Sequence, residues 1–596
     1  MGVTCRSVES SERDLWRRRT VTRDGVQLAV FEAGDADAPT VVLVHGWPDT
    51  HHLWTHVAPI LAQRYHVVAY DTRGYGESDA PSGDAPYRLA ELAADLFAVI
   101  DAVSDVPAHV VAHDWGSVQT WEAVTTAGAD DRIASFVSVS GPNLDHLGTW
   151  AREKLAHPTP TALRQALSQI ASSAYTVMFQ LPVVPKVFFG ALGWAPVWRQ
   201  FLHRVEGTAP GDVAVGPTLH HDMISGLRYY RANIRAHLFS PDARSTTVPT
   251  LEIVNTRDIA LRSAIFDNTP RYTDGLWRRD LPTGHWLPYS RPELLAENAI
   301  DFIESIISGE PSATVARARV TGDSRGAVEG TLSVVTGGGS GIGRETALLL
   351  AAEGGEVVIA DIDLGAAQKT ADEITGSGGT ARAYALDVAD SDAFARFAAT
   401  VAETHGVPDI VVNNAGIGLA GALLDATDAQ IRRLVDINLV SVATGSREFG
   451  RLMVARGLGG QIVNLASAAA FTPQRGLGAY AATKAGVLLL SESLRAELAE
   501  HHIGVSAICP GIVDTNIISA TEFAGATGDN QERLRDRMNG MYRRRGFTPD
   551  RVAVEILDAI TRNRAVVPVT IEASVGYRVY RFLPALSRRM ARTSLF

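Results

Sequence analysis

The sequence has few cysteines and lacks a long uninterrupted apolar run. Of its 596 residues only Cys5 and Cys509 are cysteine, and they lie far apart in the chain. Such a chain offers no disulfide framework, so we expect a reducing, cytoplasmic compartment. The polar N-terminal residues lack the apolar core of a signal peptide. The most apolar long stretch, residues 174–198, is interrupted by Lys186 and by prolines, so we expect no membrane-spanning helix.

The chain also lacks an excess of positive charge. Its formal net charge is −11, which argues against general binding of nucleic acids. Hydrophobic residues make up 46% and charged residues 20% of the chain, as in ordinary globular proteins. A chain of 596 residues is too long for one hydrophobic core, so we expect at least two domains. We predict no metal site.

A sharp turn after a short apolar strand is the most informative feature of the first half. Residues 110–117, VVAHDWGS, place Asp114 between small residues at positions 112 and 116. This spacing is typical of a nucleophile elbow, the strand-to-helix turn that exposes a nucleophile over a sheet. Its central residue is usually serine. An aspartate that attacks an sp3 carbon instead forms an ester, which water can hydrolyse. The sequence therefore favours a reaction such as epoxide opening by Asp114.

Three further segments complete a hydrolase pattern around this elbow. The segment HGWPDT follows a predicted strand, and the backbone amides of Trp47 and Trp115 are candidate donors to an oxyanion hole. Asp258 follows a predicted strand over residues 250–255, and His285 lies in a Gly-flanked loop. The order nucleophile, acid, histidine is that of the α/β-hydrolase fold. We predict that His285 is the base and that Asp258 holds it.

The first half resembles the α/β-hydrolase epoxide hydrolases. The motifs that carry the resemblance are His45–Pro48, Asp71–Ser78 and His113–Gly116, and it covers roughly residues 20–307. It implies a helical lid over about residues 145–240.

The resemblance also implies a reaction and the role of each residue. Asp114 would attack an epoxide carbon while Tyr175 and Tyr230 of the lid donate to the opening oxygen. His285, held by Asp258, would then activate the water that hydrolyses the ester. The product is a vicinal diol.

The nearest alternative for the first half is a haloalkane dehalogenase. Those enzymes share the Asp-Trp elbow but commonly have Asn where this chain has Trp47. Fluoroacetate dehalogenases typically carry Arg where this chain has Trp115.

The lid is rich in apolar residues, which predicts either a large, lipid-like substrate or simply a lid core. These residues are Phe179, Val183, Val184, Val187, Phe188, Phe189, Trp194 and Trp198.

The second half opens with a predicted strand over residues 331–335 and a glycine-rich turn into a helix. Gly337, Gly341 and Gly343 allow a tight turn and the close approach of a pyrophosphate to the helix N-terminus. A second predicted strand ends at Asp361. A carboxylate there can accept a hydrogen bond from the ribose 2′-hydroxyl and would repel a 2′-phosphate, so NAD is favoured over NADP.

These and later residues resemble the short-chain dehydrogenase/reductase family over about residues 330–570. The resemblance implies a catalytic set of Asn438, Ser467, Tyr480 and Lys484. It implies these cofactor-binding residues beside Tyr480 and Lys484: Thr336, Gly337, Gly341, Ile342, Gly343, Asp361, Asp387, Val388, Asn414, Ala415, Gly416, Pro510, Gly511, Val513 and Thr515. Tyr480 and Lys484 share a helical face, and the ammonium group can lower the tyrosine pKa so that the phenol exchanges a proton with an alcohol or ketone.

Together the two halves predict a bifunctional enzyme of the α/β class, similar to the hydrolase–dehydrogenase fusions of actinobacteria. We expect an α/β-hydrolase domain over residues 1–307, a linker over 308–330, a Rossmann-fold dehydrogenase domain over 331–575 and a tail over 576–596. Its partners would be a small-molecule epoxide and an alcohol or ketone. In the alternative, one half is catalytically silent and serves as a binding or oligomerisation module.

Two expectations concern larger partners. The tail mixes Arg with aromatic and Leu residues. It is expected to pack on its domain or on a neighbouring subunit, and peripheral membrane contact is the alternative. We also expect a homo-oligomer that forms through the dehydrogenase domain.

Overall fold

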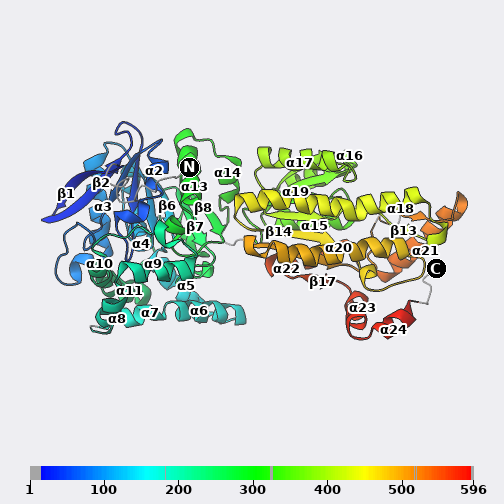
Figure 1. Cartoon of the computed structure of the whole chain (residues 1–596). Helices are drawn as coiled ribbons and strands as arrows, with labels where there is room; N and C mark the ends of the chain where they lie inside the picture. The colour runs from blue at the N-terminus through cyan, green and yellow to red at the C-terminus, as the bar shows by residue number, and fades with distance from the viewer. Residues whose placement is uncertain (1–14, 182, 323–325, 516, 518–519, 592–596) are drawn as a thin grey trace, which may run out of the picture. The chain divides into compact units, whose positions relative to one another are not determined.

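The structure is a computed structural model that describes residues 15–181, 183–322, 326–515, 517 and 520–591. The chain divides into two compact units, Met1–Ser324 and Arg325–Phe596 (Figure 1). Both units are α/β structures built on a mostly parallel sheet, as the sequence predicts.

The first unit is built on an eight-stranded sheet of order β1-β2-β4-β3-β5-β6-β7-β8. Its strands are β1 (Arg17–Arg23), β2 (Val26–Ala33), β3 (Thr40–Val44), β4 (His66–Tyr70), β5 (Ala108–His113), β6 (Ile133–Val139), β7 (Thr250–Asn255) and β8 (Leu276–Leu281). The first two strands join the sheet antiparallel, and those from β4 to β8 are parallel. Strands β3, β4, β5 and β7 are buried along their whole length, which explains their near-continuous apolar sequences. The α-helices outside the lid and before residue 309 are α2 (Ala58–Leu61), α3 (Leu89–Val103), α4 (Trp115–Val124), α12 (Leu287–Ser290) and α13 (Pro292–Ser308).

The segment between β6 and β7 is helical and occupies the region where the sequence predicts a lid. Its helices are α5 (Leu144–Ala156), α6 (Pro160–Ser172), α7 (Ala174–Phe179), α8 (Val184–Leu192), α9 (Ala195–Glu206), α10 (Leu219–Ser225) and α11 (Leu227–Phe239). Helices α6, α7 and α8 follow one another along one edge of the unit (Figure 1).

The segment predicted as a linker contains helix α14 (Ala313–Ala318). Val315 and Ala318, three residues apart, are buried. Arg319 forms a β-bridge with Trp277, and its guanidinium lies 4.7 Å from the centre of the Trp277 ring. These two buried residues are too few to give a recognisable helical pattern in a segment that is otherwise rich in Gly, Ser and charged residues. The predicted linker is therefore partly helical, and its residues 323–325 lie outside the described part of the chain.

The second unit is a parallel seven-stranded sheet of order β11-β10-β9-β12-β14-β15-β17. Its strands are β9 (Leu332–Thr336), β10 (Glu356–Asp361), β11 (Thr380–Ala385), β12 (Ile410–Asn413), β14 (Gly460–Leu465), β15 (Ile503–Cys509) and β17 (Val566–Pro568), and a separate pair is formed by β13 (Leu419–Ala420) and β16 (Glu522–Phe523). The strand order reverses between β9 and β12, which opens a crevice at the carboxyl ends of these strands.

Helices of the second unit include one irregular turn. They are α15 (Gly341–Ala352), α16 (Leu364–Gly376), α17 (Ser391–Thr404), α18 (Asp428–Val435), α19 (Ser441–Arg456), α20 (Gly478–Glu497), α21 (Asp529–Arg545), α22 (Pro549–Thr561), α23 (Ile571–Phe582) and α24 (Pro584–Met590). A π-helical turn, η8 (Asp436–Val440), joins α18 to α19. Among the described residues, no helix is long and apolar enough to cross a membrane.

The predicted tail starts at residue 576, within α23, and continues into α24. The ring of Tyr577 packs edge-on against Phe471, with 5.2 Å between the ring centres. Tyr580, Phe582 and Leu583 are exposed. Residues 592–596, also part of that prediction, lie outside the described residues.

Tryptophan is confined to one unit. All ten tryptophans lie between Trp16 and Trp286, so the first unit contains them and the second has none in its sequence.

Candidate functional sites

The turn between β5 and α4 holds Asp114 in a conformation that L-residues rarely adopt, with φ 49° and ψ −122°. Neighbouring glycines make room for it. A Cβ on Gly46 would lie 2.5 Å from Asp114 Oδ2, and one on Gly116 would lie 2.2 Å from the carbonyl oxygen of Val44. The small residues around Asp114 are therefore required by close packing, and the strained backbone is typical of a functional position.

The Asp114 carboxylate meets two predicted partners. The amide of Trp47 donates to Oδ2 over 2.8 Å. The Nε2 atom of His285 lies 3.6 Å from Oδ1. The Trp47 amide therefore stands where a charge on the Asp114 side chain, or on an acyl derivative of it, can be stabilised.

His285 and Asp258 form a buried pair. Nδ1 of His285 lies 2.7 Å from Oδ2 of Asp258, and the amides of Ala260 and Leu261 donate to Oδ1. Burial would raise the pKa of Asp258, but His285 and these amides hold it below its ordinary value. Burial would lower the pKa of His285, but Asp258 and Asp114 raise it well above its ordinary value. The structure thus brings together the three predicted residues from the turn after β5, the loop after β7 and the loop after β8.

Tyr175 and Tyr230 reach the same region from two lid helices, α7 and α11. Their ring centres are 6.2 Å apart, and the Tyr230 ring packs edge-on against Trp115 at 4.8 Å. Burial and the negative charge of Asp114 raise the pKa of both phenols, so both remain protonated donors.

Two contacts around His285 were not anticipated from sequence. Oε1 of Glu206, at the end of lid helix α9, accepts the His285 amide over 2.8 Å. The imidazole Nε2 of His113 donates to the His285 carbonyl over 2.8 Å, and burial lowers the His113 pKa to about 4. His113 directly precedes Asp114, so adjacency to the nucleophile was an available signal. Glu206 lies 79 residues from His285 and had no comparable signal.

A third residue near His285, Asp49, was also missed. Its carboxyl group accepts from Trp286 Nε1 over 3.1 Å and from the Tyr289 hydroxyl over 2.9 Å. Burial raises the pKa of Asp49 to about 7. Asp49 directly follows Trp47-Pro48 in the sequence, and this position next to a predicted site residue could have indicated it.

In the second unit the glycine-rich turn is closely packed. A Cβ on Gly343 would lie 2.2 Å from the carbonyl oxygen of Gly337, and one on Gly337 would lie 2.9 Å from Cα of Ala415. Gly337 and Gly341 have positive φ values of 65° and 55°. The side chain of Asn414 donates to the carbonyls of Thr336 and Gly337, each over 3.0 Å. These contacts hold the turn open at the start of α15, where Ile342 packs against the core.

Two acidic side chains line the carboxyl ends of β10 and β11. Oδ2 of Asp361 accepts the amide of Gly339 over 2.9 Å, which ties this carboxylate to the glycine-rich turn. Oδ1 of Asp387 accepts the amide of Ala389, and Val388 packs against the core. Both positions fit a nucleotide that lies across the strand ends.

The predicted catalytic residues of this unit come from three elements. Lys484 of α20 is buried, its Nζ donates to the carbonyl of Leu465 over 2.8 Å, and it lies 6.0 Å from the centre of the Tyr480 ring. Burial lowers the pKa of Lys484 to about 8. Ser467 follows β14, and its hydroxyl caps the next turn by accepting the amide of Ala469. Asn438 lies in the π-helical turn η8 and exchanges two hydrogen bonds with the backbone of Ile417.

The loop after β15 packs against neighbouring segments of the second unit. Val513 is buried in the same hydrophobic cluster as Val335 of β9, and the carbonyl of Pro510 accepts a hydrogen bond from the amide of Ala468. A Cβ on Gly511 would lie 2.2 Å from the hydroxyl of Thr570. A Cβ on Gly341 would lie 3.5 Å from Thr515, so this loop reaches the glycine-rich turn.

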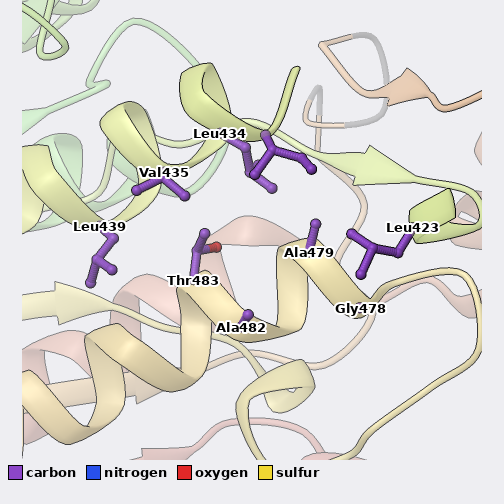
Figure 2. Close-up of a pocket in the computed structure, with 9 residues that line it drawn as sticks. Leu423, Leu434, Val435, Leu439, Gly478, Ala479, Ala482 and Thr483 are labelled. Atoms are coloured by element: carbon purple, nitrogen blue, oxygen red, sulfur yellow. The ribbon is translucent and has the colours of Figure 1, made fainter. Parts of the chain in front are cut away.

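An apolar cavity of about 290 Å³ lies beside α18 and α20 (Figure 2). Ala479, Ala482 and Thr483 of α20 face Leu423, Leu434, Val435 and Leu439 across it (Figure 2). Tyr480, Lys484 and Ser467 are not part of its lining.

Comparisons with known proteins agree with this division. The short chain dehydrogenase family model matches residues 332–523, and the alpha/beta hydrolase fold model matches residues 39–179. Over 581 residues the chain is 43% identical to "Probable oxidoreductase EphD" of Mycobacterium tuberculosis (strain ATCC 25618 / H37Rv), covering 96% of this chain and 97% of that protein.

Shorter similarities involve one half each. "Epoxide hydrolase A" of the same organism is 29% identical over 325 residues, which cover 48% of this chain and 97% of that protein. "Sorbitol dehydrogenase" of Cereibacter sphaeroides is 40% identical over 187 residues, covering 31% of this chain and 72% of that protein. With a hydrolase unit and a dehydrogenase unit in one chain, and similarity to EphD over almost its whole length, this enzyme belongs to the EphD family of fusions between an epoxide hydrolase-like α/β-hydrolase domain and a short-chain dehydrogenase domain.

Proposed function

We propose that the first unit hydrolyses an epoxide to a vicinal diol through an ester of Asp114. The observation that carries the proposal is the set of groups gathered around Asp114: His285, whose Nε2 lies 3.6 Å from the carboxylate, and the phenols of Tyr175 and Tyr230, whose pKa values the Asp114 charge raises. A carboxylate nucleophile, a base held by Asp258 and two neutral phenol donors are the groups that this reaction needs.

In the first step an oxygen of Asp114 forms a bond to an epoxide carbon, and the bond from that carbon to the ring oxygen breaks. The oxygen takes a proton from Tyr175 or Tyr230, both held neutral by their raised pKa. The product of this step is a hydroxyalkyl ester of Asp114.

In the second step water hydrolyses this ester. The ester no longer carries the Asp114 charge, which is one of two charges that raise the pKa of His285. Nε2 of His285 can then take a proton from water, whose oxygen adds to the ester carbonyl. The amides of Trp47 and Trp115 would stabilise the oxyanion, and the imidazolium returns its proton to the leaving alkoxide. The Asp114 carboxylic acid formed by this hydrolysis then gives up the second proton of the water, which restores the phenol that lost its proton in the first step.

One contact argues against a haloalkane dehalogenase. The indole N–H of Trp47 donates to the carbonyl of Met223 over 3.1 Å. It is therefore engaged and is not available to bind a halide ion.

We propose that the second unit oxidises an alcohol or reduces a ketone with NAD(H). The fit is supported by the cradle around Gly337 and Gly343, which an added Cβ would fill. Thr336, Asn414 and the loop over residues 510–515 would hold the dinucleotide, which supplies hydride chemistry when bound. A hydrogen bond between Asp361 and the ribose would favour NAD over NADP.

The chain's own groups would handle the proton in this reaction. Ser467 would orient the substrate oxygen, and Tyr480 would exchange a proton with it. The nearby Lys484 ammonium favours the tyrosinate form. Asn438, fixed on the backbone of Ile417, would support a water behind Lys484.

Substrate class and assembly complete the proposal. Phe179, Phe189 and Trp198 surround Trp47 with aromatic rings, which supports an apolar or lipid-like epoxide as the substrate.

A homo-oligomer through the dehydrogenase domain is supported by exposed apolar side chains at Leu424 and Leu489.

The test uses the full chain with a panel of epoxides and alcohols. Asp114→Ala should abolish diol formation and leave NAD-dependent alcohol oxidation intact, whereas Tyr480→Phe should do the reverse. Diol formation by Asp114→Ala at the normal rate would refute the hydrolase mechanism. Alcohol oxidation by Tyr480→Phe at the normal rate would refute the dehydrogenase assignment, and NADP preferred over NAD would refute the role of Asp361.

A further inference from the structure

Three successive lid helices, α6, α7 and α8, each expose apolar side chains. On α6, Leu163, Leu167 and Ile170 follow a spacing of four and three residues, which places them on one side of the helix. Ala162 and Ala166 on the same helix are buried. The apolar stripe of α6 therefore faces solvent while small side chains face the protein.

Helices α7 and α8 extend this surface. We define the lid face as the side chains of Leu163, Leu167, Ile170, Val177, Val187 and Phe188, which are between 46% and 71% exposed. α6 contacts α7 and α7 contacts α8, and the three helices line one edge of the first unit (Figure 1). Exposed apolar surface of this kind marks an interaction site.

The same short helices also line the candidate hydrolase site. Phe179 of α7 and Phe189 of α8 are buried, and their rings lie 5.4 and 5.3 Å from the ring of Trp47. A single layer of helices therefore separates the lid face from the groups around Asp114.

The charged residues of the lid segment over residues 154–205 are all basic. Residues 154–205 contain Lys154, Arg164, Lys186, Arg199 and Arg204 but neither Asp nor Glu, in a chain whose net charge is −11. Arg164 and Lys186 are exposed on α6 and α8, the helices that carry most of the lid face. A local positive charge beside apolar side chains is complementary to an anionic lipid surface.

We propose that the lid face docks on a bilayer that contains anionic phospholipids. Its apolar side chains enter the boundary between headgroups and acyl chains, and Arg164 and Lys186 contact the phosphates. A second copy fits this surface less well, because a two-fold contact would set these cations against their own copies. Docking would bring the site next to epoxides dissolved in the bilayer, a consequence that rests on the proposed hydrolase function.

Flotation of the full chain with vesicles tests the docking by itself. The chain should float with vesicles of mixed phosphatidylglycerol and phosphatidylcholine and bind pure phosphatidylcholine less. The double variant Leu167→Glu, Val187→Glu should weaken binding at least about tenfold, because two aliphatic side chains no longer leave water. The matched control is Val106→Glu, an exposed apolar position outside the lid, which should bind as the unmodified chain does. Lys186→Glu should also weaken binding, and Arg64→Glu, at an exposed cation outside the lid, should not.

Several results would overturn the proposal. One is that the unmodified chain fails to float with anionic vesicles. A second is binding that survives the double variant but is lost in Phe582→Glu, which would place the contact in the tail. A third is a dimer in solution that the double variant converts to monomer, which would show that a second copy covers the lid face. Turnover of a water-soluble epoxide by the double variant confirms that its site is intact.

Discussion

At the scale of single residues, the proposed hydrolase mechanism separates nucleophilic attack from ester hydrolysis. His285 would serve only the second step, whereas Asp114 would serve both. His285→Gln should therefore still form the ester and fail to cleave it. Mass spectrometry of the intact protein after addition of an epoxide should show the added mass of one substrate. Turnover of His285→Gln at the normal rate would show that another group is the base.

Lys484 gives a prediction about stability. Burial lowers its pKa from 10.5 to about 8, so the folded second unit is destabilised by holding this residue charged below pH 8. Between pH 8 and 10.5 the unfolded chain binds more protons, and stability should rise with pH through that window. Lys484→Met should then stabilise the second unit at pH 7 by about 1 to 3 kcal/mol, after allowance for the lost hydrogen bond to Leu465.

Urea unfolding followed by circular dichroism measures this effect. The gain from Lys484→Met should shrink as pH approaches 10, and dehydrogenase activity should be lost. Lys484→Arg is the control, since it keeps a buried charge and should not stabilise. Equal stability of Lys484→Met and the unmodified chain at pH 7 would contradict the predicted cost of burying this charge.

At the scale of elements, lid helix α9 contacts the loop that carries the base. Glu206 accepts the His285 amide, and a Cβ on Gly284 would lie 2.1 Å from Oε2 of Glu206. Glu206→Ala removes this acceptor, worth about 1 kcal/mol, so kcat for epoxide hydrolysis should fall roughly fivefold to tenfold. Glu206→Gln keeps an acceptor oxygen and should restore most of the rate.

A readout specific to positioning completes this test. In Glu206→Ala the loss should appear in kcat and not in KM, and alcohol oxidation by the second unit should be unchanged. A variant with full hydrolase activity would show that the contact between α9 and the His285 loop has no role in the reaction.

The elements also show which features sequence could anticipate. The elbow at Asp114 and the turn at Gly343 were predictable because each depends on close packing between residues that are neighbours in the motif or at adjacent strand ends. The contact of Glu206 with His285 was not, since it joins a lid helix to a distant loop and leaves no periodic pattern. Burial in the lid was equally hidden. Of its adjacent apolar residues Phe188 is exposed while Phe189 is buried.

At the scale of the whole molecule, two reactions in one chain suggest a sequence of reactions. The proposed diol carries a secondary alcohol, which is a substrate for dehydrogenase chemistry. With an epoxide and NAD, the full chain should produce NADH and a hydroxyketone, and either Asp114→Ala or Tyr480→Phe should abolish both. The predicted linker over residues 308–330 contains the six-residue helix α14, so it is not a fully flexible coil.

The alternative has a distinct result. If the diol accumulates for every accepted epoxide while unrelated alcohols are oxidised, the two sites serve separate substrates.

If a hydroxyketone does form, a mixture of Asp114→Ala and Tyr480→Phe chains tests whether the fusion matters. Hydroxyketone formed as fast in the mixture as in the unmodified chain would show that the diol travels through solution, with no gain in effective concentration from fusion.

The confinement of tryptophan to the first unit has a spectroscopic consequence. Reduced nicotinamide absorbs light in the range where tryptophan emits, and the proposed cofactor site lies in the unit that has no tryptophan. The chain thus carries energy donors in one unit and would hold the acceptor in the other. Quenching of tryptophan emission by bound NADH would then report on the distance between the two units by energy transfer, without any attached dye.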